Sequence, residues 1–322
     1  MSVLGIEQIT YGVTDLEECR RFLLDWGLRE LPSSDDRYRY ETLNGATVVL
    51  ADITDPHLPE AIEPGPTLRE VTWGVAGPAE LESLAHRLRE QPGFYREPLA
   101  VGCLDTNGLA IRIEPSRRRA LDITGSPANV WGRPQRIDRA SPVYARAEPI
   151  EIGHVVFFTR CLEEQVAFYR DRLGFVVSDR YTGQRGTFLR AAAQGGHHDL
   201  FLLPLPDGRR GLNHVAFTVR DIHEVFGGGL HISRKGWTTQ LGPGRHPISS
   251  AYFWYFRNPA GGLIEYYADE DVLTGAWQAR EVEPGPTVFA EWAIDGGLDG
   301  HTRRQVHAAA PAARFMTDIE PG

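Results

Sequence analysis

Short runs of β-branched and aromatic residues alternate along the chain with stretches of helical periodicity. The same order of runs occurs twice, in IEQITYGVTDLEECRRFLLDWGL near the N-terminus and in IGHVVFFTRCLEEQVAFYRDRLGF from residue 152. Each copy predicts a strand, a turn and an amphipathic helix. In the second copy Leu162, Val166, Tyr169 and Leu173 make one apolar stripe at helical spacing, and Gly174 predicts the end of the helix.

Two more strand-to-helix starts lie within the halves, VTWGVAGPAELESLAHRL and LNHVAFTVRDIHEVF. Strand-like runs lie between and after these starts, such as ATVVLADI, GTFLRAA, DLFLLPL and AYFWYF. The pattern therefore predicts four units, each a strand, a helix and further strands, with two units in each half. Strands and helices mixed in this way are typical of an α+β fold.

The stretch at residues 126–147 separates the two halves. It reads SPANVWGRPQRIDRASPVYARA, has no clean period and carries three prolines, so we predict a linker. We accordingly predict an N-terminal domain at residues 1–125 and a C-terminal domain at residues 148–281. Residues 282–322 form a tail whose role the pattern leaves open: it either covers the mouth of a site or is largely mobile.

The length of 322 residues agrees with two domains. A net charge of −9 argues against nucleic acid, because phosphate binding needs a surplus of basic side chains. No apolar run approaches the roughly 20 residues that cross a bilayer, and the start MSVLGIEQIT lacks the features of a secretion signal. Cys19, Cys103 and Cys161 form no C-x-x-C pair and predict reduced thiols. We therefore expect a cytoplasmic protein that binds neither nucleic acid nor membrane.

Histidine is concentrated in the second half of the chain. Seven of the eleven histidines lie between His154 and His246, whereas only His57 and His86 precede the linker. Imidazole changes its charge near neutral pH and is a common metal ligand. The distribution indicates that the C-terminal half carries the chemistry and that the N-terminal half is scaffold.

Three polar residues interrupt predicted apolar strands of the C-terminal half: His154 in IGHVVFF, His214 in LNHVAFTV and Glu265 in GGLIEYY. A single histidine in such a strand is more commonly a core residue with its hydrogen bonds satisfied. A buried carboxylate, however, must pair with a cation or a metal, or else face solvent. One shared metal would explain all three residues. Two histidines and a carboxylate suit non-haem Fe(II), and they would also accept Mn, Co or Zn.

The repeat provides an internal comparison for this hypothesis. Gln8 aligns with His154 at an offset of 146 residues, and Glu70 aligns with His214 at an offset of 144. Arg112 aligns with Glu265 at an offset of 153. An arginine is a permanent cation and would repel a metal. The first half therefore has the frame of the site without its ligands.

Further polar candidates surround the three residues in the sequence. His198 begins the strand-like run HHDLFL, and alternation along a strand predicts that His197 points the other way. His246 lies in a Pro/Gly-rich loop, and Tyr255 comes ten residues before Glu265. A histidine beside a metal can move a proton, and a phenol can hydrogen-bond to a developing oxyanion. Taken singly, Tyr255 could equally be a packed strand residue and His246 a solvated loop residue.

The sequence from His246 to Glu265 resembles the signature of the type I extradiol ring-cleaving dioxygenases of the vicinal oxygen chelate superfamily. His246 is followed after seven residues by Trp254-Tyr255, and after two more by Asn258-Pro259-Ala260-Gly261. Trp254 stands where the signature usually has Phe or a smaller aliphatic residue. The resemblance covers most of the chain and implies paired βαβββ modules, with an inert N-terminal half and a metal-bearing C-terminal half.

The resemblance also implies roles for individual residues. His154, His214 and Glu265 match the iron ligands, His198 matches the acid–base histidine, and His246 and Tyr255 match the substrate-facing pair. The choice of His198 over His197 rests on its place directly before Asp199-Leu200. Phe188 and His197 are further candidate residues, for the substrate pocket.

The implied activity is cleavage of an aromatic vicinal diol by O2 at Fe(II), beside the diol, to a muconic semialdehyde type of product. Mn(II) is the alternative metal, and a homo-oligomer is expected because subunit contacts are common in this family. Another enzyme of the superfamily, such as a glyoxalase-like lyase or isomerase or a thiol transferase, is the first alternative. A sequestering protein of the bleomycin-resistance kind is the second, but it would need no metal ligands. The sequence does not identify which diol is used.

Overall fold

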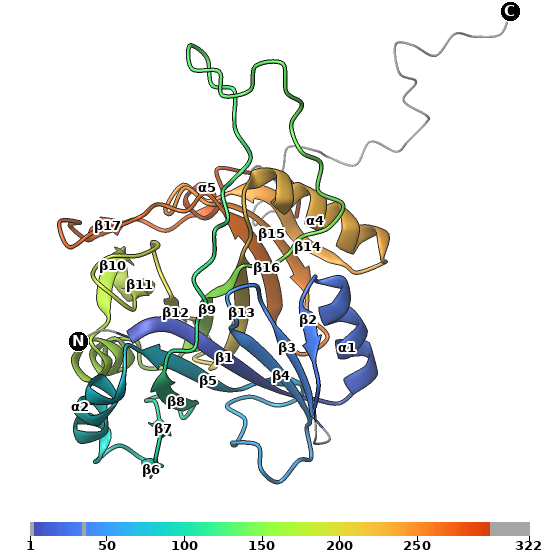
Figure 1. Ribbon diagram of the computed structural model, residues 1–322. Helices are drawn as coiled ribbons and strands as arrows, with labels where there is room; N and C mark the ends of the chain where they lie inside the picture. The colour runs from blue at the N-terminus through green and yellow to red at the C-terminus, as the bar shows by residue number, and fades with distance from the viewer. Residues whose placement is uncertain (1–2, 34–36, 297–322) are drawn as a thin grey trace, which may run out of the picture.

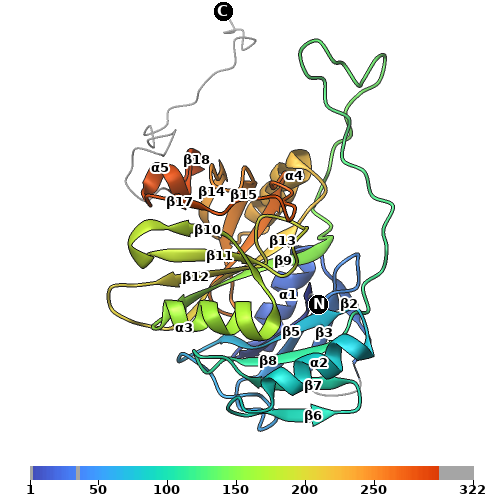
Figure 2. The same ribbon diagram turned by 90° about the vertical axis from the view of Figure 1, so that its left-hand side faces the viewer.

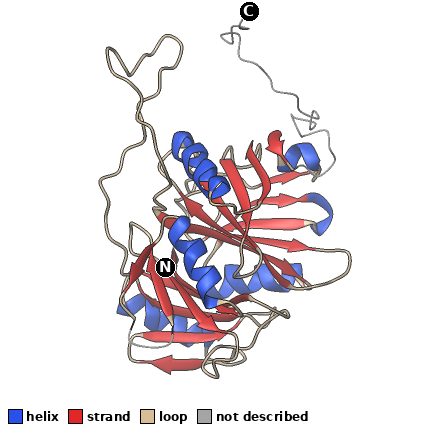
Figure 3. Ribbon diagram, turned by 90° about the vertical axis from the view of Figure 1, so that its right-hand side faces the viewer, coloured by secondary structure: helices blue, strands red, loops and turns tan. Residues whose placement is uncertain are grey.

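The computed structural model describes residues 3–33 and 37–296. Two large mixed sheets dominate it, one in each half of the chain, with helices beside the strands (Figures 1 and 3). Each sheet contains two βαβββ modules, which confirms the predicted α+β fold with four modules. No helix among the described residues is long and apolar enough to cross a membrane.

The N-terminal sheet has eight strands in the order β2-β3-β4-β1-β5-β8-β7-β6. The first strands of its modules, β1 and β5, pair antiparallel at the centre, and each pairs in parallel with the last strand of its own module. Its elements are β1 (Val3–Val13), α1 (Leu16–Asp25), β2 (Arg29–Leu31), β3 (Tyr38–Glu41), β4 (Thr47–Asp52), β5 (Thr67–Val75), α2 (Pro78–Leu88), β6 (Tyr95–Glu97), β7 (Ala100–Leu104) and β8 (Ala110–Pro115).

The C-terminal sheet repeats this plan around β9 and β13, which also pair antiparallel at the centre. Its two modules consist of β9 (Glu151–Thr159), α3 (Leu162–Ala167), β10 (Val176–Tyr181), β11 (Gly186–Arg190), β12 (Leu200–Pro204), β13 (Gly211–Thr218), α4 (Ile222–Arg234), β14 (Thr239–Arg245), β15 (Tyr252–Arg257) and β16 (Leu263–Ala268). The first and last strands of each module again pair in parallel.

The chain after the fourth module extends both edges of the C-terminal sheet. It forms β17 (Arg280–Val282), α5 (Pro286–Phe289) and β18 (Trp292–Asp295). β17 pairs with β10 and β18 pairs with β14, so the sheet has ten strands. Part of the predicted tail therefore belongs to this sheet, beyond the boundary predicted at residue 281. The rest of that tail, from residue 297, lies outside the described residues.

The apolar stripe predicted for the first helix of the C-terminal half is confirmed. Leu162, Val166, Tyr169 and Leu173 are all buried. The helix changes from α-helical to π-helical geometry at residue 168 and ends at Gly174, whose φ of 84° favours glycine.

One hydrophobic core spans both halves. Trp26, at the end of α1, is fully buried and stacks on Tyr266 of β16 with 3.6 Å between ring centroids. The Tyr266 hydroxyl donates a hydrogen bond to the Trp26 carbonyl at 2.6 Å. On the other side, Trp73 of β5 packs against Tyr169 and Phe175. The N-terminal sheet thus supports the C-terminal sheet through large aromatic contacts.

Residues 116–150 connect the two sheets and include the predicted linker. Apart from one isolated bridge between Val130 and Arg133, they form neither helix nor strand. They run as a long loop that projects from the body of the protein (Figures 1 and 2). Trp131 in this loop is fully exposed, and Val143 is 93% exposed.

Strand register in the C-terminal sheet places the polar residues of its central strands in adjacent rows. His154 on β9 is opposite Ala216 on β13, and Ala216 is opposite Glu265 on β16. His214 on β13 is opposite Val156 on β9. Residues two apart on a strand share a face, so these registers bring the three polar side chains to one region of the sheet.

The N-terminal sheet has the same registers at the aligned positions. Gln8 on β1 is opposite Thr72 on β5, and Thr72 is opposite Arg112 on β8. Glu70 on β5 is opposite Thr10 on β1. The internal alignment made from the sequence therefore corresponds to equivalent places in the two sheets.

Candidate metal centre

Three side chains from the middle of the C-terminal sheet meet at one point. The Nε2 atoms of His154 and His214 lie 3.2 Å apart. Glu265 Oε2 lies 3.2 Å from each of these nitrogens. All three residues are buried, and Glu265 is only 1% exposed. The structure thus brings together the three residues that the sequence predicts as ligands, and we call them the ligand triangle.

The hydrogen bonding of the ligand triangle fits a bound cation. Glu265 Oε2 has no hydrogen-bond partner in the described part of the chain. His214 Nδ1 lies 2.6 Å from Asn213 Oδ1, and an amide oxygen only accepts, so the hydrogen is on Nδ1 and Nε2 keeps its lone pair. Donor atoms 3.2 Å apart suit an ion whose bonds to nitrogen and oxygen are about 2.0–2.2 Å long. The donor set therefore fits a divalent metal.

The protonation of the ligand triangle also suits a metal, whose ligands must be deprotonated. Burial, with a further contribution from His198, lowers the pKa of His154 to about 3. Burial alone would raise the pKa of Glu265, but the neighbouring His154, His214 and His246 outweigh it and hold this pKa well below its ordinary value. His154 is therefore neutral and Glu265 is ionised at neutral pH.

His246 and Tyr255 lie beside Glu265, as the resemblance implies. His246 Nδ1 donates to the Phe289 carbonyl at 2.5 Å, so its Nε2 is free to accept from the Tyr255 hydroxyl at 3.0 Å. His246 Nε2 is also 3.6 Å from Glu265 Oε1. Burial, together with the charge of Glu265, raises the pKa of Tyr255 well above its ordinary value. The phenol therefore keeps its proton and remains a hydrogen-bond donor.

His198 packs directly on the ligand triangle, with its ring centroid 4.1 Å from that of His154. His197 lies behind it: this residue is fully buried, and its Nδ1 is 3.2 Å from His198 Nδ1. The expectation that the two rings point to opposite sides is wrong, because β12 begins only at Leu200 and residues 197–199 lack strand alternation. Both ring nitrogens of His197 have partners, and its place in the substrate pocket stays a prediction.

Phe188 on β11 packs against both of these histidines. Its ring centroid lies 5.2 Å from that of His198 and 5.3 Å from that of His197. It also stacks on Phe201 of β12 at 3.9 Å. An aromatic surface thus adjoins His198, and contact of Phe188 with a substrate ring stays a prediction.

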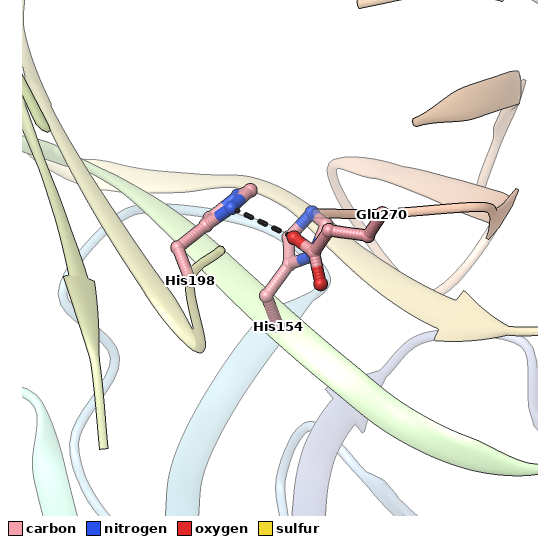
Figure 4. A group of neighbouring side chains, drawn as sticks. All are labelled: His154, His198 and Glu270. Atoms are coloured by element: carbon pink, nitrogen blue, oxygen red, sulfur yellow. Dashed lines mark ion pairs between the residues drawn. The ribbon is translucent and has the colours of Figure 1, made fainter. Parts of the chain in front are cut away.

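The sequence reasoning missed Glu270. Its Oε1 lies 3.3 Å from His198 Nδ1, and the two residues form with His154 a second group of close donor atoms (Figure 4). Burial raises the pKa of Glu270 to about 7. The run ADED at the end of the fourth module carries this residue, but a run of acidic residues is usually a solvated surface, so the sequence holds no specific signal for it.

The equivalent place in the N-terminal sheet has a different character. Gln8 accepts a hydrogen bond from Thr47 at 3.0 Å, and Arg112 pairs with Glu97 at 2.7 Å. Gln8 and Glu70 line a polar cavity of about 190 Å³. Both groups of three close donors found in residues 3–33 and 37–296 lie in the C-terminal half. An amide, a carboxylate and a guanidinium thus stand where the other sheet has the ligand triangle.

Residues 151–266 match a protein family described as the Glyoxalase/Bleomycin resistance protein/Dioxygenase superfamily. This stretch of the chain is similar to that superfamily. It runs from β9 to β16 and contains the whole ligand triangle. The match agrees with the predicted vicinal oxygen chelate type of fold.

Individual relatives extend the comparison to both halves. Metapyrocatechase 2 of Cupriavidus necator is 32% identical over 205 residues, which are 62% of this chain and 62% of that protein, less than two thirds of its length. The manganese-dependent 2,3-dihydroxybiphenyl 1,2-dioxygenase of Geobacillus genomosp. 3 is 24% identical over 81% of this chain and 87% of its own. The Mn(II)-bound glyoxalase from Novosphingobium aromaticivorans has a TM-score of 0.72 at 23% identity, covering 95% of this chain and 96% of that one, and it shares the fold.

Proposed function

We propose that the protein is an extradiol ring-cleaving dioxygenase that acts on an aromatic vicinal diol. One observation carries the proposal: three further polar side chains, those of His198, His246 and Tyr255, lie around the ligand triangle. His198 stacks on His154, and the pair formed by His246 and Tyr255 adjoins Glu265. The similarity to a relative named as a dihydroxybiphenyl dioxygenase supports the same reaction class.

His154, His214 and Glu265 would hold the metal, which we propose to be Fe(II). A bound divalent metal supplies Lewis acidity that lowers the pKa of a diol hydroxyl, and three protein ligands leave positions open for small molecules. Mn(II) is the alternative, since the same donors accept it and one relative is named as manganese-dependent.

The polar side chains around the triangle have separate tasks. Tyr255 retains its single proton, which points to His246 Nε2 in this structure. By turning this hydrogen toward the substrate, the hydroxyl would hold a negatively charged diol oxygen. His246 is held by the Phe289 carbonyl and orients that phenol through its Nε2. His198 has Nδ1 next to His197 and Glu270, so its Nε2 is the atom that exchanges a proton with the substrate.

The proposed reaction consumes one O2 and one diol and places both oxygen atoms in the product. The carbon–carbon bond beside the two hydroxyl-bearing carbons breaks, and a muconic semialdehyde type of product forms. Phe188 offers a flat apolar surface for the aromatic ring next to His198. Monocyclic, bicyclic and trihydroxylated diols remain to be distinguished by assay.

A panel of catechols tests this proposal directly. Protein reconstituted with Fe(II), and separately with Mn(II), is mixed with each diol in air, and oxygen uptake and the yellow colour of ring-opened products are recorded. We expect both signals together for at least one diol, and their loss in Glu265→Gln protein. No oxygen uptake with either metal across the panel would contradict the proposal.

A glyoxalase-like lyase or isomerase is the second candidate, because a solved structure with this fold is an Mn(II)-bound glyoxalase. Such an enzyme uses the metal site but has no evident need for His198, His246 and Tyr255 together. The same metal-loaded protein is therefore assayed with the hemithioacetal of methylglyoxal and glutathione. Turnover of the hemithioacetal without oxygen uptake on any diol would favour this candidate.

We further propose that the protein forms homo-oligomers in the cytoplasm. Trp131 and Val143 on the projecting loop are almost fully exposed, and apolar side chains gathered on a loop are a common feature of contact surfaces. Three unpaired cysteines suit a reducing compartment. Sedimentation of wild-type and Trp131→Ser protein would test the role of this loop in assembly.

A further inference from the structure

A fully buried carboxylate lies behind His198, away from the ligand triangle. Asp179 on β10 has no exposed side-chain surface. Its Oδ2 lies 2.9 Å from His197 Nε2 and 3.0 Å from Arg280 Nε. Its Oδ1 accepts from the Arg280 backbone N–H at 2.7 Å. Burying a carboxylate costs several kcal/mol unless it is well paired, so we expect Asp179 to have a role that offsets this cost.

The hydrogen bonds of Asp179 determine which nitrogen of His197 carries hydrogen. Burial would raise the pKa of this carboxyl, but hydrogen bonds from His197 and Arg280 outweigh it and hold the pKa below its ordinary value. An ionised carboxylate only accepts hydrogen bonds, so His197 must carry its hydrogen on Nε2. In the neutral imidazole the other nitrogen, Nδ1, is then an acceptor.

The position of the hydrogen on His197 in turn determines its position on His198. Nδ1 of His197 lies 3.2 Å from Nδ1 of His198, so an accepting His197 requires the hydrogen of His198 to be on Nδ1. Glu270 Oε1, 3.3 Å from the same atom, favours the same arrangement. His198 then has its lone pair on Nε2 and can accept a proton there.

We propose that Asp179 and His197 are positioning residues that hold His198 in the tautomer with a free Nε2. Resting on the proposed function, this inference gives the acid–base histidine a fixed starting state as a base toward the diol hydroxyl. Asp179 and His197 are 18 residues apart in the sequence. They meet only because the fold brings β10 next to the bend that precedes β12. A chain of Asp179, His197 and His198 therefore connects the interior of the sheet with the site.

Asp179→Asn is the direct test, because an amide can donate as well as accept. The side-chain NH2 would let His197 carry its hydrogen on Nδ1, and His198 would then carry its hydrogen on Nε2. We expect kcat on a cleaved diol to fall about 10–100-fold, as for groups that orient a catalytic histidine, with a smaller change in KM. Metal content should equal that of the wild type, since the ligand triangle is untouched.

Arg280→Gln is the matched control. This arginine is the other side-chain partner of Asp179, with its side chain 42% exposed, and among the described residues its side-chain hydrogen bonds go to Asp179 and the Ile248 carbonyl. If Asp179 acts only by anchoring the chain at β17, the Arg280 variant should lose as much activity as the Asp179 variant. If it acts through His197, the Arg280 variant should stay within about threefold of the wild type.

Nitrogen-15 NMR of the histidine side chains in zinc-loaded protein gives a readout that is independent of activity. His197→Phe and His198→Phe spectra assign the two rings. We expect a protonated Nδ1 on His198 in the wild type and in the Arg280 variant, and a shift of the hydrogen to Nε2 in the Asp179 variant. The same tautomer in all three proteins would overturn the inference.

The two proposals can fail separately. If wild-type protein cleaves no diol, the proposed function fails, whereas the NMR experiment still decides the tautomer. If the Asp179 variant does not fold, as seen by circular dichroism, His197→Phe removes the same connection and leaves Asp179 paired with Arg280. Full activity of a folded His197→Phe protein would then refute the positioning role.

Discussion

Replacing Glu265 with glutamine tests whether its carboxylate holds a metal. The amide has almost the same shape, but it removes the negative charge from a group whose Oε2 lies 3.2 Å from both ligand nitrogens. At a bond length of about 2.1 Å and an effective dielectric constant near 20, a carboxylate attracts a divalent ion by about 16 kcal/mol. Desolvation of the two ions cancels most of this attraction. If one sixth of it, about 2.7 kcal/mol, is a net gain that glutamine loses, the dissociation constant of the metal rises about 100-fold.

Thermal unfolding with and without Mn(II) measures this effect. At a metal concentration about 100 times the wild-type dissociation constant, binding stabilises the folded state by about 2.7 kcal/mol, which raises Tm by about 4 °C for a chain of this length. At the same concentration the Glu265→Gln protein should gain only about 0.4 kcal/mol, or roughly 1 °C. Metal analysis after gel filtration checks the binding independently.

Arg112→Gln is the control, because Arg112 occupies the equivalent register position in the N-terminal sheet. This variant should keep the full metal-induced rise in Tm. An equal rise in wild-type and Glu265→Gln protein would show that the metal binds elsewhere. An equal loss in both variants would show that the assignment of the two halves is wrong.

Three further predictions concern the acid–base group, a buried carboxyl and the core. His198→Phe should keep its metal but lower kcat about 10²–10⁴-fold, and unchanged turnover would move the acid–base role elsewhere. Burial raises the pKa of Asp199 to about 7, so its contribution to stability is full below about pH 4 and is lost as the pH rises to 7. The free energy of unfolding of wild-type protein relative to Asp199→Asn should therefore fall across this range, and a flat difference would contradict the assignment. Trp26→Ala should cost about 3–5 kcal/mol in urea unfolding, because it removes the ring stacked on Tyr266, whereas the exposed Trp131→Ala should cost under about 0.5 kcal/mol.

The duplicated plan of the protein is visible in the sequence because it depends on local periodicity. The stripe of Leu162, Val166, Tyr169 and Leu173 can be read directly, and all four residues are buried. Strand runs are equally local. The additional strands β17 and β18 are short, three and four residues, and their pairing with distant edges leaves no repeating pattern to detect.

At the metal centre, too, some residues can be recognised from the local sequence and others cannot. His154, His214 and Glu265 could be found because each breaks an apolar strand, and a buried polar group in such a place needs a partner. Asp179 and Glu270 lie in ordinary polar surroundings in the sequence and gave no such signal. Their contacts with His197 and His198 exist only because the sheet packs these segments together.

The sequence by itself determined the four modules, the asymmetry between the halves and the identity of the three candidate ligands, since these follow from spacing and from polar residues in apolar runs. Tertiary structure decided the rest. Strand register sets the 3.2 Å triangle, the bend before β12 turns His197 and His198 toward each other, and β17 brings Arg280 to Asp179. The physical reason is that alternation specifies which face of a strand a side chain takes, whereas hydrogen-bond partners depend on which strands become neighbours.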